Sequence, residues 1–179
     1  NSFNELTKAA SIDYGLDNLF VKKGTSLPIP AVIPLNEDFC RFLGYYVSEG
    51  YYTLKKKNGG SVVITNSNPA IIDDLRDISL NLFKLPINSR KVVSLGNSIQ
   101  HRISCLPLTK LISKLGCGRT CEEKRVPSIV FGLSKHKIAS FLMGLYSGDG
   151  SFTTSKVSGN SVRYSSTSKG LAEDVAYLL

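Results

Sequence analysis

A helical pattern of apolar residues precedes Gly50. Five apolar residues recur three or four positions apart, as on one face of a helix: Phe39, Phe42, Leu43, Tyr46 and Val47. Asn36 stands before them as a candidate N-cap, and Glu37 and Asp38 would lie at the positive end of the helix dipole. The pattern predicts a helix that begins after Asn36 and ends at Gly50.

Turn signals and apolar spacing divide the chain after Gly50 into further elements. Asn58-Gly59 is a strong hairpin signal, and Asn68-Pro69 favours a helix start because proline is tolerated in the first turn. The predicted elements are a hairpin of residues 51–57 and 61–65, a helix of residues 68–83, a hairpin of residues 92–95 and 99–105, and a helix of residues 106–115. This unit therefore has the order helix, hairpin, helix, hairpin, helix.

The chain repeats itself at an offset of 100 residues. Residues 41–50, Arg-Phe-Leu-Gly-Tyr-Tyr-Val-Ser-Glu-Gly, align with residues 141–150, Phe-Leu-Met-Gly-Leu-Tyr-Ser-Gly-Asp-Gly. Matched positions in this register include Gly44 and Gly144, Glu49 and Asp149, and Asp74 and Asp174. Chance matching seldom keeps one register without a gap from residue 44 to residue 74, so we interpret the two segments as copies of one structural unit.

The second copy is shorter than the first. Its pattern predicts a helix of residues 134–148, a hairpin within residues 151–166 and a helix that starts near Ser168. The counterpart of residues 80–124 is missing, so we expect either a fragment or a natural protein that lost its tail. The predicted organisation is a linker or the edge of a preceding domain at 1–28, a first repeat at 29–130 and a partial second repeat at 131–179.

The chain is basic, with 22 Lys and Arg against 14 Asp and Glu and a formal net charge of +8. Such a surplus suggests a polyanionic partner. Nucleic acid is favoured over a membrane, because no cationic amphipathic helix and no apolar run long enough to cross a bilayer is evident. Many small proteins are basic without binding anything, so charge alone does not decide the question.

The four cysteines are few and irregularly spaced, which is typical of a reducing compartment, and we expect a cytoplasmic protein. Cys40 and Cys105 have apolar neighbours and are interpreted as small core residues. Cys117 and Cys121 form a Cys-x3-Cys pair, but no second pair or nearby histidine completes a zinc site. Zinc or a disulfide at this pair is the less favoured alternative.

Small residues on the repeated helices indicate close packing of the two. Gly44 and Gly144 lie on apolar faces, where glycine costs about 1 kcal/mol against alanine but lets two backbones touch. Such packing would bring Glu49 and Asp149 together, and each carboxylate then raises the pKa of the other unless a cation lies between them. Mg²⁺ prefers oxygen ligands of this kind, and Mn²⁺ is a substitute for it.

A cation between two carboxylates, flanked by basic hairpins, suggests hydrolysis of a phosphodiester, because metal ions polarise the phosphoryl group and generate hydroxide. The alternative is that Glu49 and Asp149 merely end their helices at a turn. That alternative would be preferred for either residue alone. The same position in two repeats, each time before a glycine, favours the functional interpretation.

Basic residues in the predicted hairpins are candidates for DNA contact. A two-stranded ribbon fits the major groove of B-DNA. The candidates are Lys55, Lys56, Lys57, Arg90, Lys91, Arg102, Lys156 and Arg163. The alternative is that lysines on edge strands only block aggregation.

The repeated segments at 42–50 and 142–150 resemble the two signature helices of LAGLIDADG homing endonucleases. The segment that begins Lys124-Arg-Val-Pro is similar to a Lys-x-hydrophobic-Pro stretch in intein-encoded members, and the resemblance runs from about residue 29 to the end. It implies an α/β (α+β) fold of two pseudo-symmetric αββαββα units, the second incomplete, whose curved sheets form a saddle over DNA.

The resemblance also implies roles for individual residues. Glu49 and Asp149 match the family's essential acidic positions, and the carbonyls just before them, at Ser48 and Gly148, can also contact metal. Lys124 matches a lysine that assists near the attacking water or the transition-state charge. Such enzymes recognise a long asymmetric site in double-stranded DNA and leave a double-strand break. The matching members usually sit inside inteins, so we expect a host intein splicing domain in the full-length protein.

The leading hypothesis is therefore a site-specific, divalent-metal-dependent DNA endonuclease. The alternative from another class is a non-cleaving nucleic-acid-binding relic, or a maturase-like module, of the same fold. Retention of both acids favours cutting, whereas the short second repeat favours binding alone. A third interpretation is an α/β scaffold whose charge is incidental.

Overall fold

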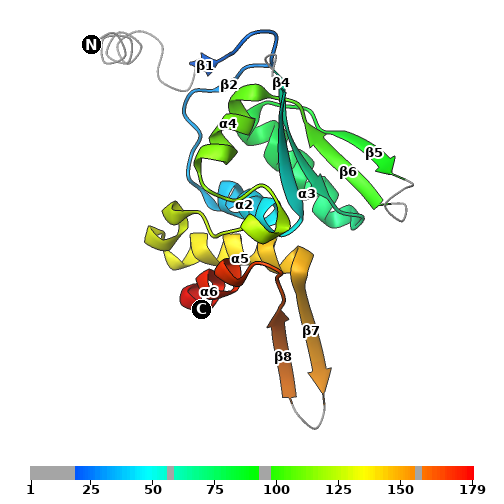
Figure 1. Ribbon diagram of the computed structural model, residues 1–179, viewed down its shortest axis with the longest axis vertical. Helices are drawn as coiled ribbons and strands as arrows, with labels where there is room; N and C mark the ends of the chain where they lie inside the picture. Colours follow the sequence, from blue (N-terminus) through cyan, green and yellow to red (C-terminus); the bar gives the residue numbers. More distant parts are fainter. Residues whose placement is uncertain (1–18, 56–58, 93–97, 156–158) are drawn as a thin grey trace.

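The computed structural model describes residues 19–55, 59–92, 98–155 and 159–179. The helices and strands, in chain order, are β1 (Phe20–Val21), β2 (Ile29–Pro30), α2 (Glu37–Glu49), β3 (Gly50–Lys55), β4 (Gly59–Thr65), α3 (Pro69–Phe83), β5 (Asn88–Val92), β6 (Ser98–Ile103), α4 (Leu106–Lys114), α5 (Lys135–Asp149), β7 (Gly150–Ser155), β8 (Gly159–Tyr164) and α6 (Lys169–Leu178), with 3-10 helices at Cys121–Glu123 and Ser128–Gly132 (Figure 1). The first unit therefore has the predicted order, and the second reaches only its second helix. The mixed α/β fold with an incomplete second repeat is confirmed.

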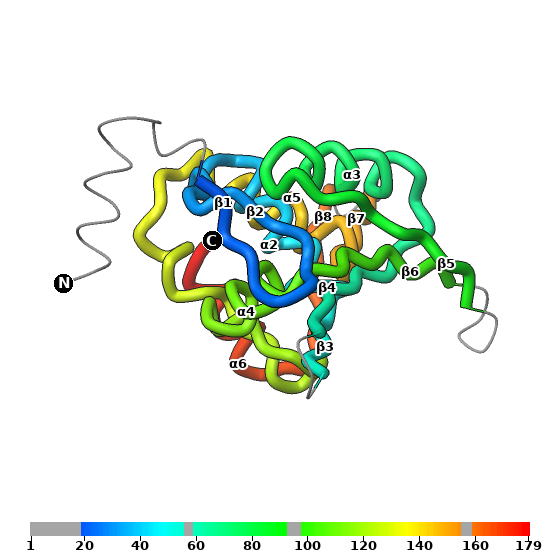
Figure 2. The backbone as a smooth tube through the Cα atoms, turned by 90° about the horizontal axis from the view of Figure 1, so that it is seen from above, coloured from blue at the N-terminus to red at the C-terminus, as the bar shows by residue number. Residues whose placement is uncertain are grey.

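The strands of the first unit form one antiparallel sheet in the order β3-β4-β6-β5. Seen from above, α3 and α4 lie on the inner side of the curved sheet, and no described helix covers its other face (Figure 2). Val62, Ile64 and Ile103 project from the sheet into the hydrophobic core on the helix side. The sheet thus has one face packed on helices and a second face, called the open face below, that no described helix covers.

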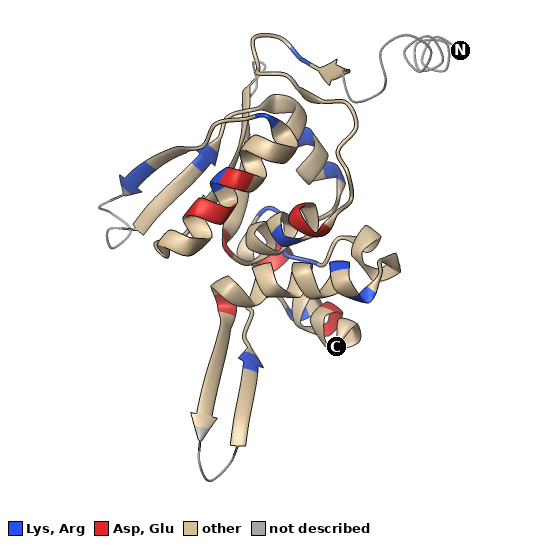
Figure 3. Cartoon of the chain, turned by 180° about the vertical axis from the view of Figure 1, so that it is seen from behind, with Lys and Arg blue, Asp and Glu red and all other residues tan. Residues whose placement is uncertain are grey.

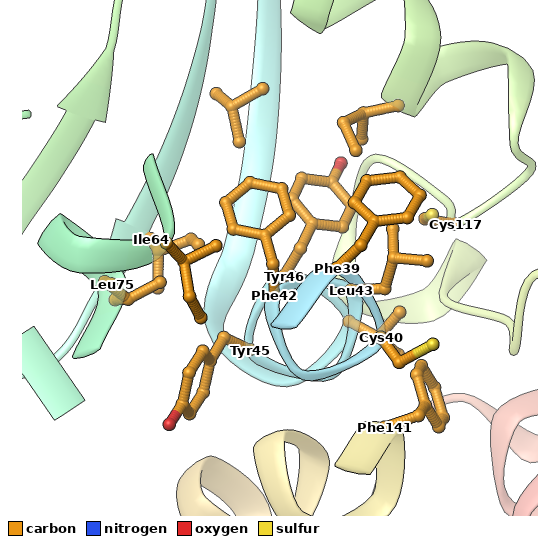
Figure 4. Packing of buried hydrophobic residues seen from close by; sticks show 14 of the residues in the cluster. Phe39, Cys40, Phe42, Leu43, Tyr45, Tyr46, Ile64, Leu75, Cys117 and Phe141 are labelled. Atoms are coloured by element: carbon orange, nitrogen blue, oxygen red, sulfur yellow. The ribbon is translucent and has the colours of Figure 1, made fainter. Parts of the chain in front are cut away.

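Helix α2 is the central element of the core. Its N-cap is confirmed, because the side chain of Asn36 accepts a hydrogen bond of 3.0 Å from the backbone N–H of Phe39. Phe42 is fully buried, and its ring lies edge-on to that of Phe83 on α3 at 4.9 Å between centroids. Figure 4 shows α2 end-on, with Phe141 of α5 on the side away from the sheet. The helix is therefore enclosed by the sheet, α3 and α5.

Two glycines bring the backbones of α2 and α5 into contact. A Cβ on Gly44 would meet the backbone oxygen of Phe141 and lie 2.7 Å from the backbone nitrogen of Leu145. A Cβ on Gly144 would meet the backbone oxygen of Arg41 and lie 3.0 Å from the nitrogen of Tyr45. The two contacts are related by the repeat, and the predicted close packing of these helices is confirmed.

The repeat also accounts for a pair of aspartates at equivalent positions. Arg41 holds Asp74 through two hydrogen bonds of 2.7 and 2.8 Å, which tie α2 to α3. Arg125 holds Asp174 through two hydrogen bonds of 2.6 and 2.7 Å, which tie α6 to the segment before α5. In each unit an arginine from elsewhere in the chain thus anchors the helix that follows the first hairpin.

The hairpin of β7 and β8 projects away from the body of the molecule (Figure 1). In the first unit Val62 is fully buried, because β4 pairs with β6 and packs against α4. Its counterpart Val162 is 62% exposed, because β8 pairs with β7 alone within the described part of the chain. The apolar face of the second hairpin is therefore uncovered.

Two predicted boundaries were wrong. Strand β5 occupies Asn88–Val92, earlier than the predicted residues 92–95, of which 93–95 lie outside the described residues. As the edge strand of the sheet, β5 is largely exposed and does not need an apolar alternation that sequence inspection can detect. Strand β6 ends at Ile103, and Cys105 is the N-cap residue of α4.

Part of the predicted linker belongs with the first unit. Strand β1 pairs with β2 across the predicted boundary at residue 28, with Phe20 opposite Pro30. Ser26 accepts a hydrogen bond of 2.8 Å from the backbone N–H of Leu106, at the start of α4. Residues 20–28 are therefore attached to the first unit by backbone and side-chain bonds.

The glycine contact makes a direct prediction. Replacing Gly44 by alanine should lower the free energy of unfolding by about 1–3 kcal/mol, because the added methyl group must push two helix backbones apart. Thermal unfolding should show this as a lower Tm. The matched control is Gly132→Ala, whose Cβ would meet nothing within 4 Å and which should leave the Tm unchanged. A Tm for Gly44→Ala at or above that of the wild type would contradict the contact.

Candidate functional site

The two repeated helices end side by side. Helix α2 ends at Glu49 and α5 ends at Asp149, and each chain turns directly into a strand at the next glycine. A Cβ on Gly148 would lie 2.6 Å from the Oγ of Ser48 and 2.7 Å from the Cγ of Glu49. The last turns therefore touch, and the structure brings the two predicted acids together.

Burial and mutual repulsion disfavour charge on this pair of carboxylates. The pKa of Glu49 is raised above its ordinary value, first by burial and second by the negative charge of Asp149. Burial likewise raises the pKa of Asp149. Lys124 acts in the opposite direction on both groups, but it does not cancel the burial. A further cation would therefore be bound favourably between them.

Lys124 is the buried cation of the site. Its side chain is 4% exposed, and its ammonium donates hydrogen bonds of 2.7 Å to the carbonyl of Tyr46 and 2.6 Å to that of Gly50. The ammonium also lies 3.9 Å from the centroid of the Tyr46 ring. Burial lowers the pKa of Lys124 to about 8. The carbonyls at the C-terminal end of α2 thus hold a lysine whose charged form is only weakly favoured.

The available ligands fit a hard divalent cation. Carbonyls in the last turn of a helix lack helical N–H partners, so those of Ser48 and Gly148 remain as oxygen donors beside the two carboxylates. No group of three or more His, Cys, Asp or Glu side chains that could hold a metal occurs among the described residues. Two carboxylates with carbonyls and water suit Mg²⁺, which keeps several waters, better than a metal that needs a complete protein cage.

Two hollows open on either side of this centre and share Ser48, Cys121 and Lys124. The Asp149 hollow has a volume of about 430 Å³ and is further lined by Val47, Asp149, Ser165, Ser166, Thr167 and Leu171. The Glu49 hollow has a volume of about 460 Å³ and is further lined by Glu49, Gly50, Tyr51, Thr65, Arg119 and Thr120. Each carboxylate therefore faces a hollow of its own.

Three of the predicted DNA-contacting residues gather on the open face of the sheet. Lys55, Arg90 and Arg102 line one recess of about 610 Å³, together with Thr53 and Ser61. The Nη1 of Arg102 donates a hydrogen bond of 2.6 Å to the Oγ of Ser61, which fixes its orientation. The recess lies on the face that no described helix covers.

The other basic candidates have different positions. Lys91 is opposite Ile99 in the β5–β6 pair, so by strand alternation it projects from the helix side of the sheet, away from Arg90. Arg163 lies on the exposed strand β8 opposite Ser151. Lys56, Lys57 and Lys156 lie outside the described residues. The described strands β3 to β8 contain no Asp or Glu, and Figure 3 shows the acidic residues on the helices and at their ends.

Sequence inspection did not find Arg119, and it considered Cys121 only as half of a Cys-x3-Cys pair. Both lie in the loop between α4 and Lys124, about seventy positions from Glu49 in sequence. Arg119 belongs to no motif and neither residue belongs to the repeated register, so nothing in the sequence placed them beside the acids. The four thiols are free, with Cys121 exposed and the other three buried. His101 is buried, and its ring nitrogens bond to Ser89 and to the carbonyl of Asn66.

None of the described helices has the length and apolar character that crossing a membrane requires.

Comparison with known proteins gives curated relatives that are mostly larger than this chain. The chain is 35% identical over 152 residues to a DNA polymerase of Thermococcus aggregans, and the match covers 83% of this chain and 8% of the polymerase. It is 30% identical over 156 residues to a replication factor C small subunit of Methanocaldococcus jannaschii, with 80% of this chain and 8% of that protein covered. The chain thus spans less than a tenth of these relatives.

The family and fold comparisons agree with each other. Residues 136–179 match the family described as LAGLIDADG-like domain. The fold is similar to that of I-DmoI in its complex with DNA and Mn, with a TM-score of 0.57, 19% sequence identity, and coverage of 82% of this chain and 77% of that one. With its duplicated motif, this matched repeat and this fold, the chain belongs to the LAGLIDADG family and has the fold of its homing endonucleases.

Proposed function

We propose that the protein is a site-specific, divalent-metal-dependent endonuclease that leaves a double-strand break in DNA. The observation that carries the proposal is the pair of half-buried carboxylates, Glu49 and Asp149, held side by side with a buried lysine. Like charges held together and partly removed from water are costly unless a ligand uses them, and perturbed pKa values cluster at functional sites. A binding module would have no use for this arrangement.

The residues of the site have distinct tasks in phosphodiester hydrolysis. A divalent cation, when bound, would polarise the phosphate and supply hydroxide. Glu49 and Asp149, with the carbonyls of Ser48 and Gly148, would hold it, and Mg²⁺ fits this oxygen donor set, with Mn²⁺ as a substitute. Lys124 uses two of its three N–H donors on backbone carbonyls, which leaves one for a water or a phosphate oxygen.

The open face of the sheet would supply the DNA-binding surface. Lys55, Arg90 and Arg102 line one recess there, and no carboxylate lies on the described strands to repel phosphate. Arg163 extends positive charge to the second hairpin. Two unequal hairpin surfaces on one chain would read a long asymmetric site, because the two halves of the target face different side chains. The solved structure of similar fold is a complex with DNA and Mn, which supports DNA as the ligand.

The comparisons also support an origin within an intein. The two relatives are a DNA polymerase and a replication factor C subunit, and each match covers 8% of the larger protein. Similar segments inside unrelated replication proteins are what a mobile element would leave. We infer that the full-length protein contains a host intein splicing domain, and that its endonuclease part has a first repeat at 29–130, to which residues 20–28 attach, and a second repeat at 131–179.

Removing either acid tests the proposed chemistry. Glu49→Gln and Asp149→Asn should each reduce the rate of DNA cleavage in Mg²⁺ at least about a hundredfold, because metal-derived charge stabilisation in the transition state is lost. DNA binding should persist, as measured by mobility shift on a target selected from a random-sequence duplex library. The matched control Asp73→Asn removes an exposed carboxylate of α3 and should cut normally. Binding without cutting by the wild type would support the non-cleaving alternative.

Metal binding should be visible without DNA. Mg²⁺ or Mn²⁺ should raise the Tm of the wild type, because a ligand that binds only the folded state stabilises it. The Glu49→Gln/Asp149→Asn double variant should show no such rise. Without metal it should be more stable than the wild type at neutral pH, because two half-buried charges that repel each other are absent. Equal metal-induced shifts in both proteins would place the metal elsewhere.

Adjacent residues of β5 test which sheet face meets DNA. Arg90→Ala should weaken binding and reduce the slope of log affinity against log salt by about 0.9, the value for one lost phosphate contact. Lys91→Ala changes the same charge on the helix side of the same strand and should leave the slope unchanged. Equal effects of the two substitutions on the salt slope would show that DNA does not bind preferentially to the open face.

A further inference from the structure

Arg119 lies in a loop that is fixed to the catalytic helix. The hydroxyl of Tyr46, on α2, donates a hydrogen bond of 2.8 Å to the carbonyl of Gly118. Gly118 has a φ of +76°, and a Cβ there would lie 2.7 Å from the backbone nitrogen of Lys124. The loop therefore packs directly on the backbone of the site lysine, and Arg119 enters the Glu49 hollow from it.

The guanidinium of Arg119 is held on one edge. Its Nε donates a hydrogen bond of 3.2 Å to the carbonyl of Tyr52, and its central carbon lies 5.7 Å from the centroid of the Tyr52 ring. The hydroxyl of Tyr52 accepts a hydrogen bond of 3.3 Å from Ser113, so the aromatic surface under the arginine is itself tied to α4. These contacts orient the side chain before any ligand arrives.

Arg119 differs from the structural arginines of the molecule. Arg41 and Arg125 each hold an aspartate through Nε and Nη2. No carboxylate lies within ion-pair distance of Arg119 in the described part of the chain, and Glu123 accepts instead from the backbone N–H groups of Arg119 and Thr120. The outer N–H groups of its guanidinium therefore remain available in the planar arrangement that matches a phosphate.

The two hollows differ in their positive charge. Lys124 lines both of them. Among the described lining residues Arg119 adds a second cation to the Glu49 hollow. The Asp149 hollow has Ser165, Ser166 and Thr167 on its lining and, among its described residues, no cation other than Lys124. An arginine in only one hollow can act on only one of the two scissile phosphates.

We propose that Arg119 binds the scissile phosphate that occupies the Glu49 hollow, and that it thereby serves the cleavage of one DNA strand and not the other. The inference rests on the proposed endonuclease function and extends it to a residue outside the repeated motif. Arg119 donates two N–H groups to non-bridging oxygens of that phosphate, beside the cation site at Glu49.

Strand-resolved cleavage tests the proposal. A duplex selected by the wild type from a random-sequence library carries a different fluorophore on each strand, and single-turnover rates are measured in Mg²⁺. Arg119→Ala should slow the cleavage of one strand about tenfold or more, because a charge-assisted contact to a single phosphate is lost. It should change the cleavage rate of the other strand less than about twofold. Arg119→Lys should recover only part of the rate, because an ammonium cannot bind two oxygens in one plane.

The matched control is Arg76→Ala, which removes an exposed arginine on α3 that pairs with Asp73. It should change the cleavage rate of neither strand. Thermal unfolding of Arg119→Ala separates a binding role from a structural one, since a structural role lowers the Tm and slows both strands alike. Equal slowing of both strands, or no slowing of either, would overturn the proposal.

A binding measurement in EDTA keeps the test independent of cutting. A neutral methylphosphonate replaces each scissile phosphate in turn. At one of the two positions it should weaken wild-type binding about tenfold. At that position it should not weaken the binding of Arg119→Ala any further. If Arg119→Ala retains the full methylphosphonate penalty at both positions, the contact does not exist. A wild type that binds but cuts neither strand refutes the proposed function, while this binding cycle still decides the role of Arg119.

Discussion

The backbone contact between α2 and α5 is the constraint on which the rest of the structure depends. Two helices can approach this closely only where both lack a Cβ at the crossing, as Gly44 and Gly144 do. Because the crossing is fixed there, the last turns converge at Gly148, and the chain turns at once into the first strand of each hairpin. The same contact therefore sets the position of the acids and the directions in which the two hairpins leave the centre.

This geometry has an electrostatic consequence. Glu49 and Asp149 are brought together in a partly buried place, where burial raises the pKa of each carboxyl and burial lowers the pKa of Lys124 to about 8. All three groups are therefore less stable in their charged forms than they would be in water. A divalent cation would relieve the first two shifts directly. The site is thus incompletely stabilised by its own residues, which is consistent with the proposal that it binds a metal together with water and substrate.

The sequence predicted the helices, the repeat and the two acids because each leaves a periodic or duplicated signal. The repeat also placed Asp74 and Asp174 in register, but their common role, in which each accepts from an arginine elsewhere in the chain, is seen only in the structure. Sequence inspection failed at the exposed edge strand β5, which has no apolar alternation. It also placed Lys91 with Arg90, because strand register determines the face and is set by pairing with β6. Arg119 left no signal, since only the folded loop brings it to Glu49.

The most direct test of the central claim is a crystal structure of the protein with its selected DNA duplex in Mn²⁺, with anomalous scattering used to locate the metal. The contact at the two glycines brings the acids at the helix ends together, so a metal should bind there. The predicted result is an anomalous peak within bonding distance of a carboxylate oxygen of both Glu49 and Asp149, next to a phosphate of the DNA. A structure with bound DNA in which no metal peak lies at these two carboxylates would contradict it.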